Sequence, residues 1–561
     1  MAAHLRPAQV MHRAKLRAQR TALGRWPQAG RRLCAGPDPR CAVGWPARFS
    51  SLETRSHADR PTLTELDAGK TRILGVARDL GDPPDWQQAD APLLWRFHLH
   101  YWDWAWGLAT DPDRSAARTT FARLWRSWLA AGAFGQGDAW YPYPAALRAW
   151  SWCVLHRHLV AGGEIEPRFV EELALHAGFL RRHLESDVRG NHLVKDLKAL
   201  VGLAVFFADD RLLRQALGRL TRQLGVQVLP DGGHYERSPA YQCQVVADLI
   251  DVADLIRAAG HAPVPEITAA ITRMRRWLGI VLSPAGELPM LNDGYPVAAG
   301  LIAALRPQPP PPAAMLSLPD TGLVRADVAG WHLLADVGTP SAAGLAGHAH
   351  AGTLGCVLHF GAAPLLVDTG TSTYEAGPTR AYERSTAAHN TVQIDDADST
   401  EIWGAFRAGR RARVHSLVIR NDADGVAVEA AHDGFRGLPG RPCHRRRWSL
   451  TCAGLRVDDL VTGRGQHRVV IRWHLAPGST VRPEADCAFV TTPTGVFLVT
   501  VATAARMTLH IDFAPVAADF LCTSESPVLT CHVKAVLPVG VTTRWRQVPD
   551  PDGVASIKGG A

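Results

Sequence analysis

The stretch LIAALRPQPPPPAAMLSLPDTGLVRADV, residues 301–328, contains the point at which the pattern of this 561-residue sequence changes. The run PQPPPP at residues 307–312 cannot continue a helix and favours an extended polyproline conformation. Before this run, apolar residues recur at spacings of three and four, which is typical of helices. After it, short segments rich in β-branched residues are separated by turn residues, which is typical of antiparallel strands.

Five segments before residue 305 show the helical spacing most clearly. They are LWRFHLHYWDWAWGLA, YPAALRAWSWCVLHRHLV, FVEELALHAGFLRRHLES, HLVKDLKALVGLAVFFA and CQVVADLIDVADLIRAAG. Helix pairs with wide, Trp-rich apolar faces predict an incomplete α/α toroid, and the later segments predict an antiparallel β-sandwich. The fold class is therefore multidomain α + β. We expect a basic, poorly ordered segment at residues 1–60, the toroid at 61–306, a Pro-rich linker at 307–316 and the sandwich at 317–561.

The composition of the chain excludes several classes of protein. With 47% hydrophobic and 20% charged residues, the chain is neither disordered nor a coiled coil for most of its length. The 61 Lys and Arg residues exceed the 53 Asp and Glu residues, and the scattered arginines suit an acidic sugar better than a nucleic acid. Ten cysteines form no C-x-x-C pair, which argues against a zinc ribbon or a thioredoxin-type site. No apolar run predicts a membrane span or a clear signal peptide.

The stretch RGNH at residues 189–192 precedes a long apolar helix. Asn191 there is a good N-cap residue, which is the purely structural interpretation. The alternative is that Asn191 and His192 form a site for an anionic group at the start of this helix.

The stretch DGGHYERSPAYQ, residues 231–242, combines a turn with the start of another helix. Its Ser-Pro pair is an N-cap and first-turn signal, so we expect Tyr241 in the first turn of that helix. Glu236 and Arg237 lie close to Tyr241 in the sequence. A polar loop, LNDGYP, contains Asn292 and ends the helical part.

The strongest candidate stretch runs from Gly347 to Asp395. His350 lies two residues after His348, Asp368 ends the next strand, and His389 precedes a third strand. Imidazoles and a carboxylate from adjacent strands make a plausible Zn²⁺ site. Tyr374, Arg380, Tyr382 and Arg384 lie between these residues in the sequence.

Several motifs occur in an order that resembles the bacterial heparinase II/III family of polysaccharide lyases. They are FHLHYWDW, WYPYPAALRAW, NHLVKDLKAL, DGGHYERSPAY, LNDGYP, HAHAGTLGCVLHF, LVDTGTSTYE, RSTAAHNTVQIDDADSTEIWGAFRAGRRARV, HDGFRGLPGRPCHRRR and RWHLAP. The resemblance covers about residues 90 to 480. It implies a helical toroid, a β-sandwich, and cleavage of an acidic polysaccharide by β-elimination.

The resemblance also implies residue roles. Asn191, helped by His192, matches the group that neutralises the uronate carboxylate, while Tyr241 and His348 match the catalytic tyrosine and histidine. The residues expected to bind the substrate are Glu236, Arg237, Asn292, Tyr374, Arg380, Tyr382 and Arg384. Which of Tyr241 and His348 removes the C5 proton stays open, and positive neighbours such as Arg237 would be needed to favour a phenolate.

In some members of the family, the positions of His350, Asp368 and His389 hold a structural metal, so zinc is expected and an organic cofactor is not. Family members usually carry Asp where this chain has Gly352, so a probable outer partner of the site is missing here. The family leads us to expect a periplasmic or extracellular protein.

Two alternatives to a lyase stay open. Toroids also host hydrolases that use paired carboxylates, for which Glu236 and Asp293 are candidates. The chain could instead be a non-catalytic protein that binds glycans or helps to assemble an exopolysaccharide. The sequence does not decide the oligomeric state.

Overall fold

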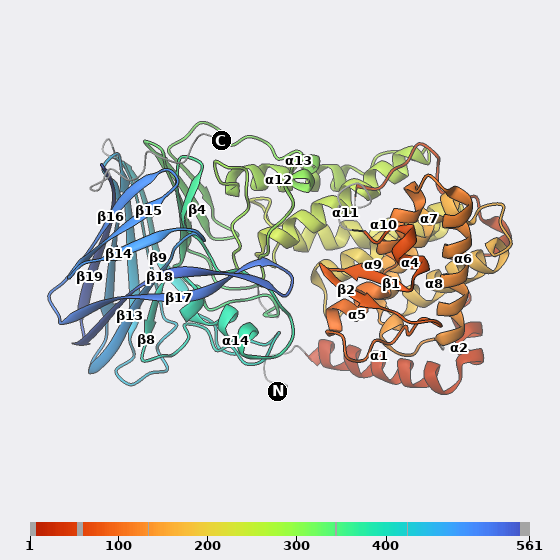
Figure 1. Cartoon of the computed structure of the whole chain (residues 1–561), viewed down its shortest axis with the longest axis horizontal. Coiled ribbons are helices and arrows are strands. Elements are labelled where there is room, and N and C mark those ends of the chain that lie inside the picture. Colours follow the sequence, from red (N-terminus) through yellow and green to blue (C-terminus); the bar gives the residue numbers. More distant parts are fainter. Residues whose placement is uncertain (1–6, 53–59, 133, 343–344, 423–424, 550–561) are drawn as a thin grey trace. The chain divides into compact units, whose positions relative to one another are not determined.

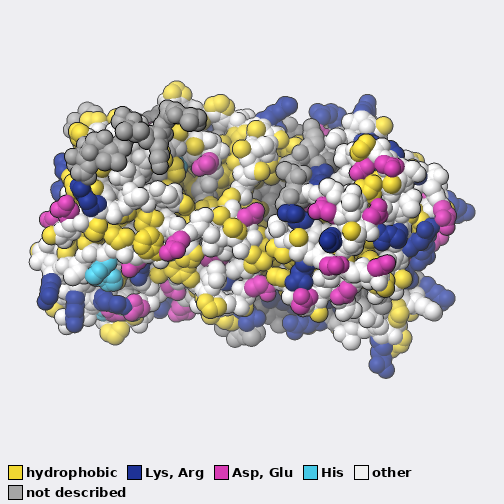
Figure 2. Space-filling view, viewed as in Figure 1, with side chains coloured by type: hydrophobic (Ala, Val, Ile, Leu, Met, Phe, Trp, Pro, Cys, Tyr) yellow, Lys and Arg dark blue, Asp and Glu magenta, His cyan; other side chains and the backbone are white. Residues whose placement is uncertain are grey.

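The computed structural model describes residues 7–52, 60–132, 134–342, 345–422 and 425–549 (Figure 1). The chain forms two compact units. The first contains Met1–Gln227 and Gln244–Thr272, and the second contains Val228–Cys243 and Arg273–Ala561. On the face shown in Figure 2, Lys and Arg side chains are interspersed with Asp and Glu. None of the described helices is long and apolar enough to cross a membrane.

The first unit is built from helices that pack in pairs. Its main helices are α5 (Leu93–Leu99), α6 (Arg114–Ala131), α7 (Pro142–Leu155), α8 (Glu166–Arg182), α9 (Gly190–Phe206) and α10 (Asp210–Gln227), and it includes most of α11 (Pro239–Ala258) and the first half of α12 (Pro265–Val281). Every residue of α9 except His192 is buried, and α9 packs against α7 and α10. Helix α10 buries only one stripe, with Leu212, Leu220 and Leu224 inward and arginines outward. This arrangement of inner and outer helices is the predicted α/α toroid.

The N-terminal segment differs from the expectation of a poorly ordered arm. Within residues 1–60 the structure places α1 (Pro7–Arg25) and α2 (Pro27–Leu33), followed later in the chain by α4 (Leu63–Asp67) and a hairpin of β1 (Lys70–Ile73) and β2 (Val76–Asp79). Arg13 Nε donates to Asp187 Oδ2 over 3.0 Å, and Trp45 Nε1 donates to Gly202 O over 2.8 Å. Arg13 and Arg31 therefore pair with acidic residues later in the chain, Asp187 and Glu172, and Trp45 is buried against α9.

The second unit contains three antiparallel sheets. The first follows the order β14 (Thr480–Pro483), β15 (Cys487–Thr492), β16 (Gly495–Thr503), β19 (Val539–Val548), β12 (Gly454–Thr462), β11 (Cys443–Thr451), β10 (Gly425–His432), β9 (Val414–Asp422). The second follows β17 (Met507–Asp519), β18 (Cys522–Val536), β13 (Gln466–His474), β8 (Val392–Ile394). The third follows β3 (Met315–Leu318), β4 (Leu323–Val328), β5 (Trp331–Asp336), β6 (Cys356–Phe360), β7 (Ala363–Leu366). Strands of all three sheets share one hydrophobic core around Trp331, Trp448, Trp473 and Trp545, as a sandwich requires.

The boundary between helical and β sequence does not coincide with the boundary between the units. Helix α13 (Ala299–Leu305) ends before the proline run, and β3 already begins inside the expected linker. The second half of α12 belongs to the second unit, where Trp277 Nε1 donates to Thr321 Oγ1 over 3.0 Å. The segment Val228–Cys243 also belongs there, and it carries Tyr241. Tyr241 and His348 are therefore parts of the same unit.

Candidate active site

Tyr241 and His348 are neighbours in the second unit. Tyr241 lies in the first turn of α11, as predicted, and Ser238 before it donates its hydroxyl to Asp293 O over 2.9 Å. His348 lies in the loop that precedes β6. The two rings have centroids 4.3 Å apart at an interplanar angle of 41°. Tyr241 Oη also lies 2.8 Å from Tyr374 Oη. A phenol and an imidazole are thus in direct contact.

Asp293 is a carboxylate that contacts several residues of this site. It is fully buried. Its Oδ2 lies 2.7 Å from His348 Nδ1 and 2.9 Å from Arg380 Nη2. Its Oδ1 lies 2.7 Å from His350 Nε2. Burial alone would raise the pKa of Asp293, but Arg380 and the two histidines outweigh it and hold the pKa well below its usual range. A carboxylate accepts only, so His348 donates from Nδ1.

This hydrogen bond fixes the tautomer of His348. With the proton on Nδ1, Nε2 carries the lone pair, and the side chain keeps 17% of its surface exposed. Glu236 Oε1 lies 3.7 Å from His348 Nε2. The sequence suggested Asp293 only as a hydrolase candidate. Because both its oxygens are occupied and it is buried, it serves instead to hold His348 and cannot act directly on a sugar.

The surroundings of Tyr241 differ from the expectation of a positive field. Burial raises the pKa of Tyr241 well above 10, with Tyr374 and Asp293 adding to the effect. Arg237, which was expected to favour the phenolate, donates instead to Thr339 O and Thr339 Oγ1 and to Asp320 O. These surroundings therefore favour the protonated phenol of Tyr241 over the phenolate.

Three of the residues predicted to bind substrate form hydrogen bonds within the protein instead. Arg384 is fully buried and donates to backbone carbonyls, among them those of Ala349 and Gly404. Arg380 is buried against Asp293, and Asn292 donates to Arg237 O and accepts from His350 N. Their polar groups are used up by these contacts, which fix the loops around His348.

Tyr374 and Tyr382, like Arg237 and Asn292, are predicted substrate residues that keep part of their surface exposed. Tyr374 contacts Tyr241 as described, whereas Tyr382 lies on α14 (Pro378–Arg384), where burial raises its pKa to about 12.

Phe406, missed in the sequence, forms an aromatic platform with Tyr374. Phe406 is 50% exposed, and Trp403, three residues earlier in the chain, is 38% exposed. The Phe406 ring stacks on Tyr374 at 5.7 Å and 10°. The signal was present in the quoted stretch EIWGAFRAGRR, but a sequence does not show that its aromatic residues stay exposed.

The predicted metal residues lie close together. His389 Nδ1 lies 2.8 Å from Asp368 Oδ2, and the His350 and His389 rings are 5.4 Å apart. His350 Nδ1 and His389 Nε2 are buried, and neither has a hydrogen-bond partner among the described residues. Even so, no group of three His, Cys, Asp or Glu side chains in the described part of the chain is arranged to hold a metal ion. A Cβ at Gly352 would lie 2.9 Å from His389 Cγ, so the ring of His389 occupies the space that a larger residue would need.

Asn191 and His192 belong to the first unit. Asn191 is buried in the first turn of α9 and is not its N-cap, a position taken by Arg189 at a φ of 62°. The structural interpretation of Asn191 as a cap is therefore wrong, because the chain enters the helix two residues earlier. His192 Nδ1 lies 3.1 Å from Glu185 Oε2, and its ring lies 4.2 Å from that of Tyr143.

Comparison with known proteins gives matches over most of the chain. Residues 86–306 match the model of the heparinase II/III N-terminus, and residues 310–520 match the heparinase II/III-like C-terminal model. The FtsZ-localized protein C of Caulobacter vibrioides is 27% identical over 470 residues, which are 77% of this chain and 78% of that protein.

Solved structures share the fold. A heparinase III structure matches with a TM-score of 0.70 at 14% identity, covering 90% of this chain and 86% of that one. A mutant of the heparan sulfate lyase HepC from Pedobacter heparinus matches with a TM-score of 0.63 at 16% identity, covering 97% and 89%.

Proposed function

Because the chain belongs to the heparinase II/III-like family, we propose that it is a polysaccharide lyase that cleaves a uronate-containing glycan by β-elimination. The observation that carries the proposal is the pairing of Tyr241 with His348, whose rings lie 4.3 Å apart while Asp293 holds His348 Nδ1. β-Elimination needs one group that takes a proton from C5 and one that gives a proton to the departing oxygen. An imidazole and a phenol side by side can supply both.

The geometry favours His348 as the base and Tyr241 as the acid. His348 Nε2 takes the C5 proton, the C5–H electron pair forms the C4–C5 double bond, and the C4–O bond breaks. Tyr241 gives its hydroxyl proton to the departing oxygen, and its raised pKa means that the proton is present before the reaction. The Tyr374 hydroxyl, 2.8 Å from that of Tyr241, can return a proton to it.

The C5 proton is poorly acidic while the neighbouring carboxylate is negative, so a further group must hydrogen-bond that carboxylate. We propose Asn191, helped by His192, for this role, which rests on the family resemblance. Asn191→Ala should then lower kcat far more than it raises KM, because the carbanion-like state needs this contact more than the ground state does.

A structural zinc ion at His350, Asp368 and His389 is a separate proposal. It is supported by the two buried ring nitrogens without partners, which are donor atoms that zinc accepts. As ligands, His350, Asp368 and His389 would hold the ion, and Asp368 would then give up its hydrogen bond to His389. Metal analysis of the purified protein and of His389→Ala tests this directly.

The lyase activity is tested by following the ultraviolet absorbance of the new C4–C5 double bond on heparan sulfate, hyaluronan and alginate. Tyr241→Phe and His348→Gln should each abolish the signal. Tyr141→Phe is the matched control, because it removes a hydroxyl from an exposed tyrosine whose ring packs on Arg20. New reducing ends without this absorbance would overturn the proposal in favour of hydrolysis, as would a fully active Tyr241→Phe.

The name of one relative favours a second candidate function, which is localisation with FtsZ. The FtsZ-localized protein C is similar to this chain over 77% of its length, so this chain could share that localisation with or without catalysis. A fluorescent fusion, examined for overlap with FtsZ in the native host, tests this. The same fusion determines the compartment, for which the family favours the periplasm or the exterior.

A further inference from the structure

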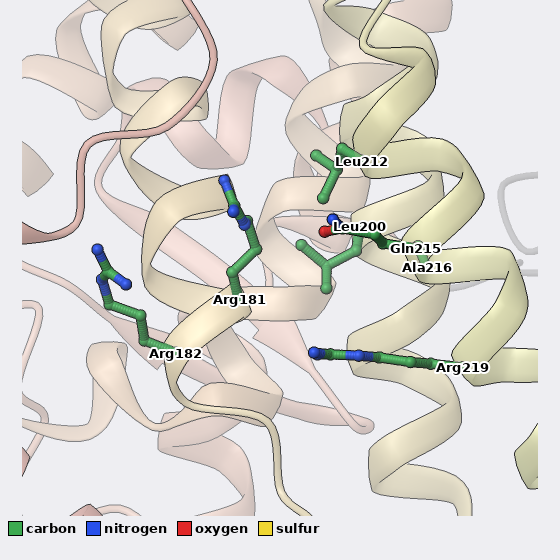
Figure 3. A pocket seen from close by; sticks show the side chains of 7 residues that line it. All are labelled: Arg181, Arg182, Leu200, Leu212, Gln215, Ala216 and Arg219. Atoms are coloured by element: carbon green, nitrogen blue, oxygen red, sulfur yellow. The ribbon is translucent and has the colours of Figure 1, made fainter.

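The first unit contains a small pocket that the proposed reaction does not use. It has a volume of about 120 Å³ and is lined by Arg181 and Arg182 of α8, Leu200 of α9, and Leu212, Gln215, Ala216 and Arg219 of α10 (Figure 3). Residues 212, 215, 216 and 219 recur at the spacing of one helix face, so successive turns of α10 form one wall. Arg219 extends from α10 toward α8 in Figure 3.

The charges around this pocket are of one sign. Arg181, Arg182 and Arg219 are exposed, and in the part of the chain that the structure describes none of them has a carboxylate at ion-pair distance. Arg182 Nε donates to Leu33 O over 2.7 Å. Three exposed guanidinium groups at one pocket create a positive potential that attracts anions from solvent.

The remaining lining residues define what kind of anion fits. Leu200, Leu212 and Ala216 are buried and form an apolar floor, where contacts between charges are screened less than in water. The side chain of Gln215 adds an amide donor. The volume of about 120 Å³ is large enough for a small anion.

We propose that this pocket binds a sulfate or phosphate group, either as a free ion or carried by a larger ligand that extends outward. Arginine binds such groups through paired N–H donors, and arginines from two different helices can approach one tetrahedral group from different sides. The site lies within the first unit and does not depend on the lyase proposal.

Binding is measured by calorimetry and thermal unfolding on the full chain with inorganic phosphate, inorganic sulfate and a sulfated disaccharide, against potassium chloride at equal ionic strength. The loss of one charge-assisted contact predicts that Arg219→Ala and Arg181→Ala weaken binding about tenfold or more. Arg219→Lys, which keeps the charge but loses the fork, should weaken it less. Arg214→Ala, an exposed arginine of α10 outside the pocket, should change the Kd less than twofold.

The probes separate the sources of the anion. Binding of the free ions indicates a small-ion site, whereas binding of the sulfated disaccharide alone indicates a group carried by a glycan, and both outcomes support the proposal. It is overturned if chloride produces the same thermal shift, if Arg214→Ala weakens binding as much as Arg219→Ala, or if none of the probes binds.

Discussion

Replacement of Asp293 by Asn tests the proposed mechanism most sharply. The change keeps the size of the side chain but removes the charge that faces His348, His350 and Arg380. An amide can donate to His348 Nδ1 and so favour the tautomer with the proton on Nε2, which cannot act as a base. In a comparable Asp–His arrangement such a change lowers kcat by about 10⁴-fold, so we expect a loss of about 10³- to 10⁴-fold here.

The same substitution also affects stability, and the chain offers a control for this effect. Loss of one partner from a buried ion pair costs about 3–5 kcal/mol. Asp459 is a second buried carboxylate between a histidine and an arginine, with His444 Nε2 and Arg446 Nε each 2.7 Å from its Oδ1. Asp459→Asn should therefore lower the melting temperature to a similar degree without the loss of kcat.

Both variants are assayed below their melting temperatures for the rate of double-bond formation, with kcat and KM determined separately. A folded Asp293→Asn that keeps kcat within threefold of the wild type would refute the role of Asp293 in holding His348. Equal losses of kcat in both variants would show that the effect is general destabilisation.

Three further predictions concern other parts of the second unit. Burial would raise the pKa of Asp459, but Arg446 and His444 lower it to about 2. Its contribution to stability, on the order of 2–3 kcal/mol, is complete above the unfolded pKa near 3.9 and is lost as the pH falls toward 2. Urea unfolding between about pH 5 and 2 should therefore show a shallower loss of stability in Asp459→Asn. Phe406→Ala removes one ring of the platform and should raise KM by about two- to tenfold with little change in kcat, whereas a fall in kcat alone would contradict a binding role. Gly352→Asp forces the His389 ring to move and should destabilise the fold by about 1–3 kcal/mol, and an unchanged melting temperature would show that the ring yields freely.

The order of the elements could be predicted because it depends on local pattern. The three- and four-residue spacing before the proline run and the β-branched segments after it are read from neighbours in the chain, and the structure confirms both. The start of α11 could also be predicted from neighbouring residues. Ser238 and Pro239 determine where that helix begins, and hence where Tyr241 lies. The catalytic roles of Tyr241 and His348 were expected from the resemblance of their motifs to the heparinase II/III family, and they stay predictions.

Tertiary structure decided how those residues are held. Asp293 meets His348 across 55 positions and Arg380 across 87, and no local pattern reports a contact over that distance. The same holds for Trp45, which was assigned to a poorly ordered arm but bonds to Gly202 across 157 positions. Burial explains the difference: a side chain's charge state and partners depend on which surfaces close over it, and these come from distant segments that only the folded chain brings together.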